Sequence, residues 1–455
     1  MSNFIYVMSD EHNPFVSSIY GHPSVHTPNM ARLAERGTVF ENTYCPSPLC
    51  LPCRSAFFAG RRVHEIQTYN NCNTGLRKGF PSFGRLLTDQ GVHTTFIGKS
   101  DGYDRVANFG FSEIIEAQDR DSPDCHIRRE PLEIRPDAAS RARHYGPHEA
   151  PFETDLKRTD AAIRWLRETA PQIGSPWVLC VNLNKPHFPH YVTPDLWSMY
   201  DGCDDLPRYG AEQESAQHQH ATDLRRYFAT DQFTEEDIRG LRRGYLGCVT
   251  FIDTQLGRLI DALDESGLSD STNIAYTSDH GDMLGMFGMW WKCSLYEHSV
   301  RVPLIVAGPD FSAGAWCETP VSSLDLQASI FHATGAKRPE DLTGEPLQEL
   351  PHNDSQRIIF SEYHGHGARA SAYMVRRGEW KFIYYVGAPN QLFNLASDPN
   401  ELDNRIESET EIARELESEL RCVCDPENEN ERASAFIEMQ RTAALEGFAR
   451  GGCCE

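Results

Sequence analysis

A cysteine and an arginine form the most informative short pattern in this 455-residue sequence. Cys50 precedes Pro52 and Arg54 in the order Cys-x-Pro-x-Arg, at the start of a short helix-like run. The free N–H groups and the dipole of a helix N-terminus attract anions, and a planar guanidinium adds a second anion contact. The pattern therefore predicts a thiol placed beside a bound anion.

Four further polar clusters directly follow predicted strands. They are Asp10-Glu11-His12, Lys99, Lys185-Pro186-His187 and Asp279-His280. In an open α/β sheet, ligands bind outside the carboxyl ends of the strands. Four such clusters, together with the segment around Cys50, indicate one site assembled from distant parts of the chain.

The residue types in these clusters suit a divalent cation and an anion. Asp10 and the pair Asp279-His280 offer carboxylate oxygens and an imidazole, which are ligands of hard or borderline cations. Lys99 and Lys292 could contact an anion, but each could instead be a solvated or snorkelling lysine. His187 stands between two prolines that stiffen its loop. That presentation suits a positioned acid or base, and a surface-loop histidine is the alternative.

A parallel sheet would bring these residues together. Strand and helix patterns alternate along the first 110 residues, which is typical of a parallel sheet with helices on its faces. The longest expected helix begins after a cap at Thr234 and ends at Gly267. Shorter helices are expected at 28–36 and 83–90, and strands at 3–9, 38–44, 93–97, 177–183, 273–277 and 302–306.

The pattern changes after residue 350. Three strand-like segments follow, two of them joined by a turn at Arg377-Gly378, and then two charged helical segments. We therefore expect an α/β fold with a large, mostly parallel or mixed sheet between helices in residues 1–350. Residues 351–455 should form a smaller antiparallel sheet and a helical tail. The polar segments 116–153 and 201–232 are expected to shape a substrate pocket, since long loops in compact domains are often functional.

Composition excludes several classes of protein. A net charge of −23 argues against nucleic-acid binding and means that an anion site needs its own local cations. No apolar run is long enough to cross a membrane. Fourteen cysteines are too few for a disulfide scaffold of this length. Without a signal-peptide pattern, we expect reduced thiols and a cytoplasmic location. The charged tail helices leave a homo-oligomer open.

These motifs, in this order, resemble the type I sulfatases of the alkaline phosphatase superfamily, and the resemblance runs nearly end to end. The Asp279-His280 pair is similar to that of choline-sulfatases and phosphonate monoester hydrolases, and Tyr69-Asn70-Asn71 looks closer to the choline-sulfatase branch. The motifs that carry the resemblance are Asp10, Thr27-Pro28-Asn29, Cys50-x-Pro52-x-Arg54, Gly98-Lys99, Pro186-His187-x-Pro189, Ser278-Asp279-His280-Gly281, Lys292 through Arg301 and Leu392-Phe393-Asn394.

The resemblance implies a covalent modification and a metal. A formylglycine-generating maturation enzyme would oxidise Cys50 to formylglycine (3-oxoalanine), which hydrates to a gem-diol. One divalent metal, calcium in the first place and manganese in the second, would be held by Asp10, the modified Cys50, Asp279 and His280. Glu11 is a doubtful additional ligand.

The resemblance also implies a reaction. The ionised gem-diol oxygen, favoured by the metal and Arg54, would attack the sulfur of a small-molecule sulfate ester and release alcohol and inorganic sulfate. The residues implied to bind the substrate are Asn71, Lys99, His187 and Lys292. Of these, Lys99, His187 and Lys292 would neutralise charge on the sulfuryl oxygens, and His187 or Lys292 would protonate the leaving alcohol.

Two departures from the family pattern leave alternatives open. The usual Gly-Lys-x-His is Gly98-Lys99-Ser100-Asp101 here, so one cation is missing and the acid could face a cationic or hydroxylated part of the substrate. Cys53 creates a Cys-x-x-Cys with Cys50, which admits a redox or zinc interpretation. The same fold could also serve a phosphonate monoester or phosphodiester hydrolase, or a non-catalytic anion-binding protein with an unmodified cysteine. The sequence does not identify the alcohol.

Overall fold

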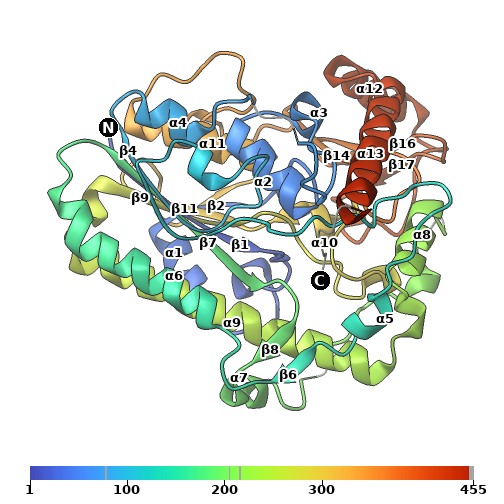
Figure 1. Ribbon diagram of the computed structural model, residues 1–455, viewed down its shortest axis with the longest axis horizontal. Helices are drawn as coiled ribbons and strands as arrows, with labels where there is room; N and C mark the ends of the chain where they lie inside the picture. Colours follow the sequence, from blue (N-terminus) through green and yellow to red (C-terminus); the bar gives the residue numbers. More distant parts are fainter. Residues whose placement is uncertain (77–78, 204, 215–216, 450–455) are drawn as a thin grey trace.

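The structure is a computed structural model that describes residues 1–455 except 77–78, 204, 215–216 and 450–455. A mixed sheet of eight strands lies between two layers of helices (Figure 1). In spatial order its strands are β12 (Ala315–Cys317), β2 (Gly37–Phe40), β11 (Leu304–Ala307), β9 (Thr272–Ser278), β1 (Asn3–Asp10), β7 (Trp177–Pro186), β4 (His93–Lys99) and β5 (Glu113–Gln118).

Five neighbouring strands of this sheet run parallel. Strand β1 pairs in parallel with both β7 and β9, and β4 pairs in parallel with β7 and β5. Strand β11 is antiparallel to β9 and β2, which makes the sheet mixed. The carboxyl ends of β9, β1, β7, β4 and β5 therefore lie along one edge, as the sequence predicted for the first four.

Helices cover both faces of the large sheet. On one face α1 (Pro28–Arg36), α6 (Glu153–Arg164) and α9 (Glu235–Glu265) pack against alternate side chains of β1 such as Ile5 and Val7. On the other face α2 (Cys50–Ala59), α4 (Phe83–Thr88) and α11 (Ser323–Thr334) pack against Phe4 and Tyr6. A strand that is buried on both faces reads as a continuous apolar run, and this explains the N-terminal sequence.

The cap predicted for the longest helix is present. Thr234 Oγ accepts the amide of Asp237 at 3.1 Å, and Asp237 Oδ2 accepts the amide of Thr234 at 2.9 Å. This reciprocal pair satisfies two of the N–H groups that a helix start leaves unpaired.

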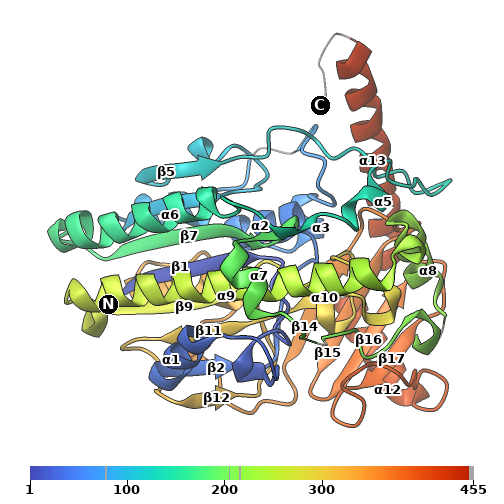
Figure 2. The ribbon, with the colours of Figure 1, turned by 90° about the horizontal axis from the view of Figure 1, so that it is seen from below.

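A second sheet lies beside the first (Figure 2). Its apolar face packs against α12 (Thr410–Val423) through side chains that include Phe382 and Leu416. The smaller antiparallel sheet and helical tail were predicted, whereas a division of the chain at residue 350 stays a prediction. The antiparallel strands and tail helices are β14 (Ile358–Tyr363), β15 (Ala372–Arg377), β16 (Trp380–Tyr385), β17 (Gln391–Asn394), α12 (Thr410–Val423) and α13 (Pro426–Ala449).

Two predicted strands are broken in the structure. The segment 38–44 divides into β2 and β3 (Thr43–Tyr44), which belong to different sheets. The segment 302–306 divides at Pro303 into β10 (Arg301–Val302) and β11, because proline has no N–H to donate to a ladder. Strand β13 (Val321–Ser322) pairs with β3.

The polar segments contain more regular structure than expected. Strand β5 ends inside 116–153, which also holds α5 (Ala138–Arg141) and β6 (Tyr145–Pro147), and α6 follows without having been predicted. The remaining short elements are α3 (Val63–Ile66), β8 (His190–Val192), α7 (Pro194–Met199), α8 (Gln219–Tyr227) and α10 (Glu297–Val300).

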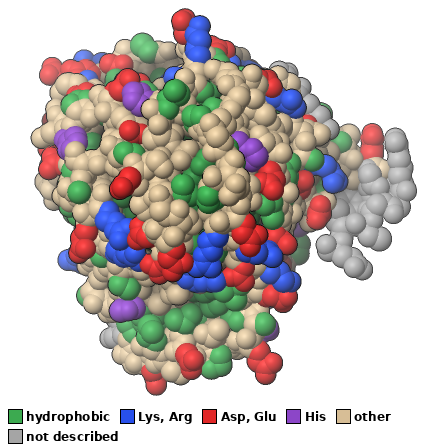
Figure 3. Space-filling model, turned by 90° about the vertical axis from the view of Figure 1, so that its left-hand side faces the viewer, with side chains coloured by type: hydrophobic (Ala, Val, Ile, Leu, Met, Phe, Trp, Pro, Cys, Tyr) green, Lys and Arg blue, Asp and Glu red, His purple; other side chains and the backbone are tan. Residues whose placement is uncertain are grey.

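Charged side chains of both signs are interspersed on the face shown in Figure 3. Among the described residues, no helix combines the length and apolar character that a membrane span requires.

Candidate active site

The carboxyl ends of four adjacent strands bring the predicted residues together. Asp10 ends β1 and Lys99 ends β4, while His187 follows β7 and the pair Asp279-His280 follows β9. The register places Asp10 beside Pro186 and Ser9 beside Ser278, so that residues distant in sequence become neighbours. Gly98 permits the close pairing of β4 with β7, because a Cβ at that position would lie 1.9 Å from the carbonyl oxygen of Asn182.

Cys50 is the first residue of α2 and is fully buried among these strand ends. Its Sγ lies 3.2 Å from His280 Nε2 and 3.8 Å from Asp10 Oδ1. Asn71 Oδ1 accepts the amide of Leu51 at 3.0 Å and lines the adjoining cavity. Asn71 therefore fixes the start of the helix that carries Cys50.

Arg54 joins the two buried carboxylates from the next turn of α2. Its Nε donates to Asp279 Oδ2 at 2.7 Å, and Nη2 lies 3.5 Å from Asp10 Oδ2. Nη1 donates to Asn182 Oδ1 at 3.1 Å. The guanidinium thus holds both acids toward Cys50 and offsets their mutual repulsion.

The donor atoms of Asp10, Cys50, Asp279 and His280 lie within 4.8 Å of one another. Burial alone would raise the pKa of Asp10, but Lys99, His187 and Arg54 hold it well below its ordinary value. Burial lowers the pKa of His280, whereas Asp279 and Cys50 raise it to about 10. Two carboxylates and one imidazole around a position-50 side chain fit a hard or borderline divalent cation, which would displace the imidazole proton on binding.

Glu11 belongs to a neighbouring group. Its carboxylate forms a second potential metal-binding set with Asp10 and His187. Glu11 Oε2 lies 2.9 Å from Lys292 Nζ and 3.5 Å from His187 Nε2. Burial raises the pKa of Glu11 well above its ordinary value, although Lys292 lowers it. Glu11 Oε1 is buried without a hydrogen-bond partner among the described residues.

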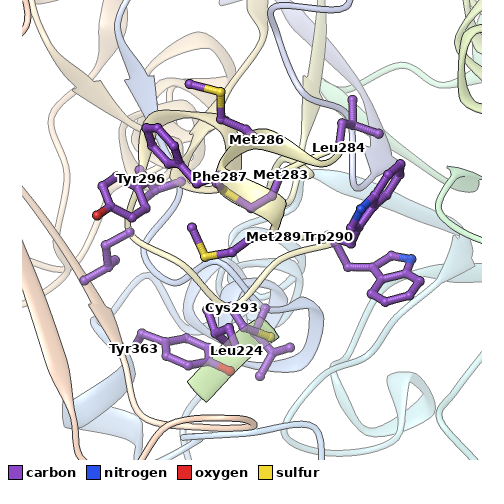
Figure 4. Close-up of a cluster of buried hydrophobic side chains, with 14 of the residues drawn as sticks. Leu224, Met283, Leu284, Met286, Phe287, Met289, Trp290, Cys293, Tyr296 and Tyr363 are labelled. Carbon is purple, nitrogen blue, oxygen red and sulfur yellow. The ribbon is translucent and has the colours of Figure 1, made fainter. Parts of the chain in front are cut away.

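Lys292 is held by an unusual stretch of backbone. Trp291 and Cys293, on either side of it, have φ angles of 62° and 79°, in the left-handed region that side chains other than glycine rarely adopt. Such conformations cost about 1–3 kcal/mol each and persist only where the surroundings fix them. Here the surroundings are a cluster of buried apolar side chains, shown in Figure 4, that includes Met283, Met289 and Trp290.

Asp101 does not face the cavity as a free acid, contrary to the expectation that it could meet a cationic or hydroxylated part of the substrate. Its Oδ2 lies 3.3 Å from Lys99 Nζ and accepts a hydrogen bond from Arg120 Nη2 at 2.5 Å. Lys99 Nζ also pairs with Asp10. Asp101 is therefore already paired with two cations of the protein, Lys99 and Arg120.

A cavity of about 610 Å³ opens from Lys99, His187 and Lys292. The segment 116–153 supplies much of its wall, as predicted, whereas 201–232 supplies Phe228. The residues of 116–153 that line the cavity are Gln118, Asp119, Arg120, Asp121, Ser122, Asp124, Arg135, Arg141, Pro151 and Phe152.

Sequence reasoning missed Asp155. This buried residue of α6 accepts the amides of Asn184 at 2.8 Å and Lys185 at 2.9 Å, just before His187. It therefore fixes the loop that presents the histidine. No local motif marked it, because its partners are backbone groups on another element.

Cys53 is not paired with Cys50. Its Sγ donates to the carbonyl oxygen of Asp279 at 2.8 Å, and burial together with Cys45 raises its pKa well above the ordinary value. A raised pKa disfavours the reactive thiolate. Among the described residues, the potential metal-binding groups contain Cys50 and no other cysteine. These observations disfavour the redox and zinc interpretations.

The pattern of the Sulfatase family matches residues 2–336, and that of the C-terminal region of N-sulphoglucosamine sulphohydrolase matches 285–425. The chain belongs to the sulfatase family. It is an enzyme that hydrolyses sulfate esters, as the sequence motifs predicted.

Two curated relatives illustrate the similarity. The choline-sulfatase of Rhizobium meliloti (strain 1021) is 30% identical over 423 residues, covering 87% of this chain and 80% of the relative. The arylsulfatase K of Danio rerio is 32% identical over 432 residues, covering 87% and 78%.

Solved structures share the fold. The phosphonate monoester hydrolase SpPMH from Silicibacter pomeroyi superposes with a TM-score of 0.73 at 23% identity, over 93% of this chain and 94% of its own. BT4656, solved with D-glucosamine-2-N,6-O-disulfate, gives 0.72 at 20% identity, over 97% and 98%.

Proposed function

We propose that this sulfatase acts through a formylglycine derived from Cys50 and one divalent metal. The observation that carries the proposal is the position of Cys50 Sγ, 3.2 Å from His280 and 3.8 Å from Asp10, inside the group of potential metal ligands. When present, the hydrated aldehyde supplies a nucleophilic oxygen and the metal supplies Lewis acidity.

The residues that would hold the metal are Asp10, Asp279, His280 and the side chain at position 50. Their oxygen atoms favour calcium, and the imidazole makes manganese the second choice. Arg54 keeps both carboxylates oriented through its bonds to Asp279 and Asp10.

Cations on two sides of Cys50 would bind the sulfuryl oxygens. Burial lowers the pKa values of Lys99 and Lys292, but neighbouring acids and Cys50 raise both above the ordinary value, so both ammonium groups carry charge at neutral pH. Preorganised charges in a buried site stabilise developing negative charge without reorganisation. Lys99 approaches from β4, and Lys292 from the loop after β9.

His187 is placed to handle the proton of the leaving alcohol. Its Nδ1 donates to the carbonyl oxygen of Phe188 at 2.6 Å, which leaves Nε2 free of that bond, 3.5 Å from Glu11 Oε2. Burial and the charge of Lys292 lower the pKa of His187 well below its ordinary value. An anionic substrate would raise that pKa again, so Nε2 can carry a proton while the ester is bound and release it to the alcohol.

Mass spectrometry of the Cys50 peptide tests the modification. Protein made together with a formylglycine-generating enzyme, the proposed maturation partner, should lack the sulfur and carry the lower mass of an aldehyde. A plain thiol in fully active protein would contradict the proposal, and a protein with that thiol and no turnover would favour the non-catalytic alternative.

Chelation tests the proposed metal, and a panel of substrates tests the reaction class and the alcohol. Removing divalent ions should abolish turnover, and calcium should restore it better than manganese. Sulfate monoesters should be hydrolysed faster than phenyl phosphonates, and the reverse order would favour the phosphonate monoester alternative. Comparing choline, aryl, alkyl and carbohydrate sulfates then identifies the alcohol.

A further inference from the structure

The active-site edge of the sheet continues to a fifth strand. Strand β5 pairs in parallel with β4, and its last residue, Gln118, lies beside Lys99. The amide of Ser100 donates to the carbonyl oxygen of Gln118 at 2.9 Å, and Ser100 Oγ donates to Asp119 Oδ1 at 2.6 Å. The residues after β5 are therefore fixed against the motif Gly98-Lys99-Ser100-Asp101, and Arg120 is among them.

Arg120 shares a carboxylate with Lys99. Its Nη2 donates to Asp101 Oδ2 at 2.5 Å, and the same oxygen lies 3.3 Å from Lys99 Nζ. Asp101 has a φ angle of 45°, a left-handed conformation that its contacts must fix. Both cations line the cavity, with 22% of the Arg120 side chain and 13% of the Lys99 side chain exposed.

The guanidinium of Arg120 has donors to spare. A guanidinium offers five N–H donors, and in the described part of the chain Arg120 is seen to donate through Nη2 to Asp101. Its Nε is buried without an acceptor among the described residues. Burial lowers the pKa of Arg120, whereas Asp101 and Cys50 raise it, so the side chain is charged.

We propose that Arg120 binds an anionic oxygen of the sulfuryl group, in the role left open by the missing cation of the Gly-Lys-x-His pattern. Asp101 stands where the family pattern has a basic residue, and Arg120, in the segment after β5, supplies a cation to the same side of the site. This inference rests on the proposed function, since it assumes that the sulfuryl group lies beside Cys50 and Lys99. The alternative anionic ligand of Arg120 is a carboxylate or a second sulfate group on the alcohol part of the substrate.

Inorganic sulfate and p-nitrophenyl sulfate separate the two sources, because neither carries a second anionic group. In mature, metal-loaded enzyme, Arg120→Ala should raise the sulfate inhibition constant and the KM for p-nitrophenyl sulfate about tenfold or more. Arg120→Lys should recover part of the loss. Arg164→Ala, which removes the same charge from the exposed face of α6, should change neither value.

Unchanged sulfate inhibition and KM in Arg120→Ala would overturn the inference while leaving the proposed function intact. A rise in KM restricted to esters with a second anionic group would overturn it too, because Arg120 would then bind the alcohol. Wild-type enzyme that is modified and metal-loaded but inactive would instead reject the proposed function itself.

A double substitution distinguishes ligand binding from a structural ion pair. Histidine tolerates positive φ better than most residues, so Asp101→His can restore the family pattern at a position with a φ angle of 45°. In the Arg120→Ala background it should recover most of the lost sulfate affinity. Asp101→Asn in the same background removes the unpaired acid without adding a cation, so it should recover little of that affinity. Equal recovery by Asp101→Asn and Asp101→His would show that Arg120 only neutralises Asp101, and would overturn the inference.

Discussion

The active site and the joint between the two sheets each bury several acids and bases. At the joint, Lys381 of β16 is fully buried, with Nζ 2.8 Å from Glu297 Oε1 and 2.7 Å from Glu401 Oε1. Tyr44 donates to Glu297 Oε2 at 3.0 Å. In the active site, by contrast, both lysines, Lys99 and Lys292, line a cavity.

The difference shows that buried charged groups can serve either stability or catalysis. In a closed cluster of charged side chains, the ion pairs hold elements of the fold together. Removing one partner leaves a buried charge without its counter-ion. An open cluster keeps charged groups facing a cavity, where they can act on a ligand. Substitutions at the joint should therefore change stability, and those at the sheet edge should change turnover.

The largest expected effect is that of Cys50→Ala. It removes the thiol whose oxidation generates the aldehyde, so the proposed nucleophile cannot form and kcat should fall by about 10⁵-fold or more. The Cβ remains and no ion pair is broken, so the thermal unfolding midpoint should stay near that of the wild type. Steady-state kinetics and calorimetry check the two parts, and appreciable turnover in pure Cys50→Ala would contradict the mechanism.

Lys292→Ala should come next. It removes one proposed sulfuryl contact, and kcat/KM should fall by about 10²–10³-fold. Lys337→Ala, at an exposed position, removes the same charge and serves as the control. Equal kinetics for the two variants would place Lys292 outside the catalytic machinery.

Lys381→Met tests the other side of the comparison. It strands the buried carboxylates of Glu297 and Glu401, which should lower the free energy of unfolding by about 3–5 kcal/mol. Urea denaturation measures the loss. The kcat of the folded fraction should be unchanged, and a large fall in kcat without a loss of stability would remove the distinction between joint and active site.

The smallest expected effect is a pH dependence of stability from Glu401. Burial raises its pKa from 4.5 to about 7, although Lys381 lowers it. Between these values the folded state holds a proton that the unfolded state has released, so stability falls as pH rises. The difference in unfolding free energy between wild type and Glu401→Gln should change by up to about 3 kcal/mol across that range. A difference independent of pH would show that Glu401 does not titrate there.

The sequence predicted the site best where one simple rule applied. Asp10, Lys99, His187 and Asp279 each mark the end of a strand, and parallel strands end at one edge. Arg120 was missed because it lies in a polar segment without periodicity. Its ion pair with Asp101 was missed because the two residues lie in loops after different strands, β5 and β4.

Other features had no local signal or remain untested. The left-handed backbone around Lys292 depends on packing that no short motif encodes. The break at Pro303 did have a signal, since proline cannot join a ladder. The roles of the site residues, the domain boundary at residue 350, the cytoplasmic location and a homo-oligomer stay predictions.

The complete burial of Cys50 sets an order of events in the life of this chain. All ten residues of α2 are buried, and the thiol at its start is enclosed by strand ends that only the finished sheet brings together. If a maturation enzyme oxidises Cys50, as proposed, it would have to reach the thiol before the fold closes. Chains that fold before oxidation would keep the thiol. The fraction of active enzyme would then depend on the rate of oxidation relative to the rate of folding.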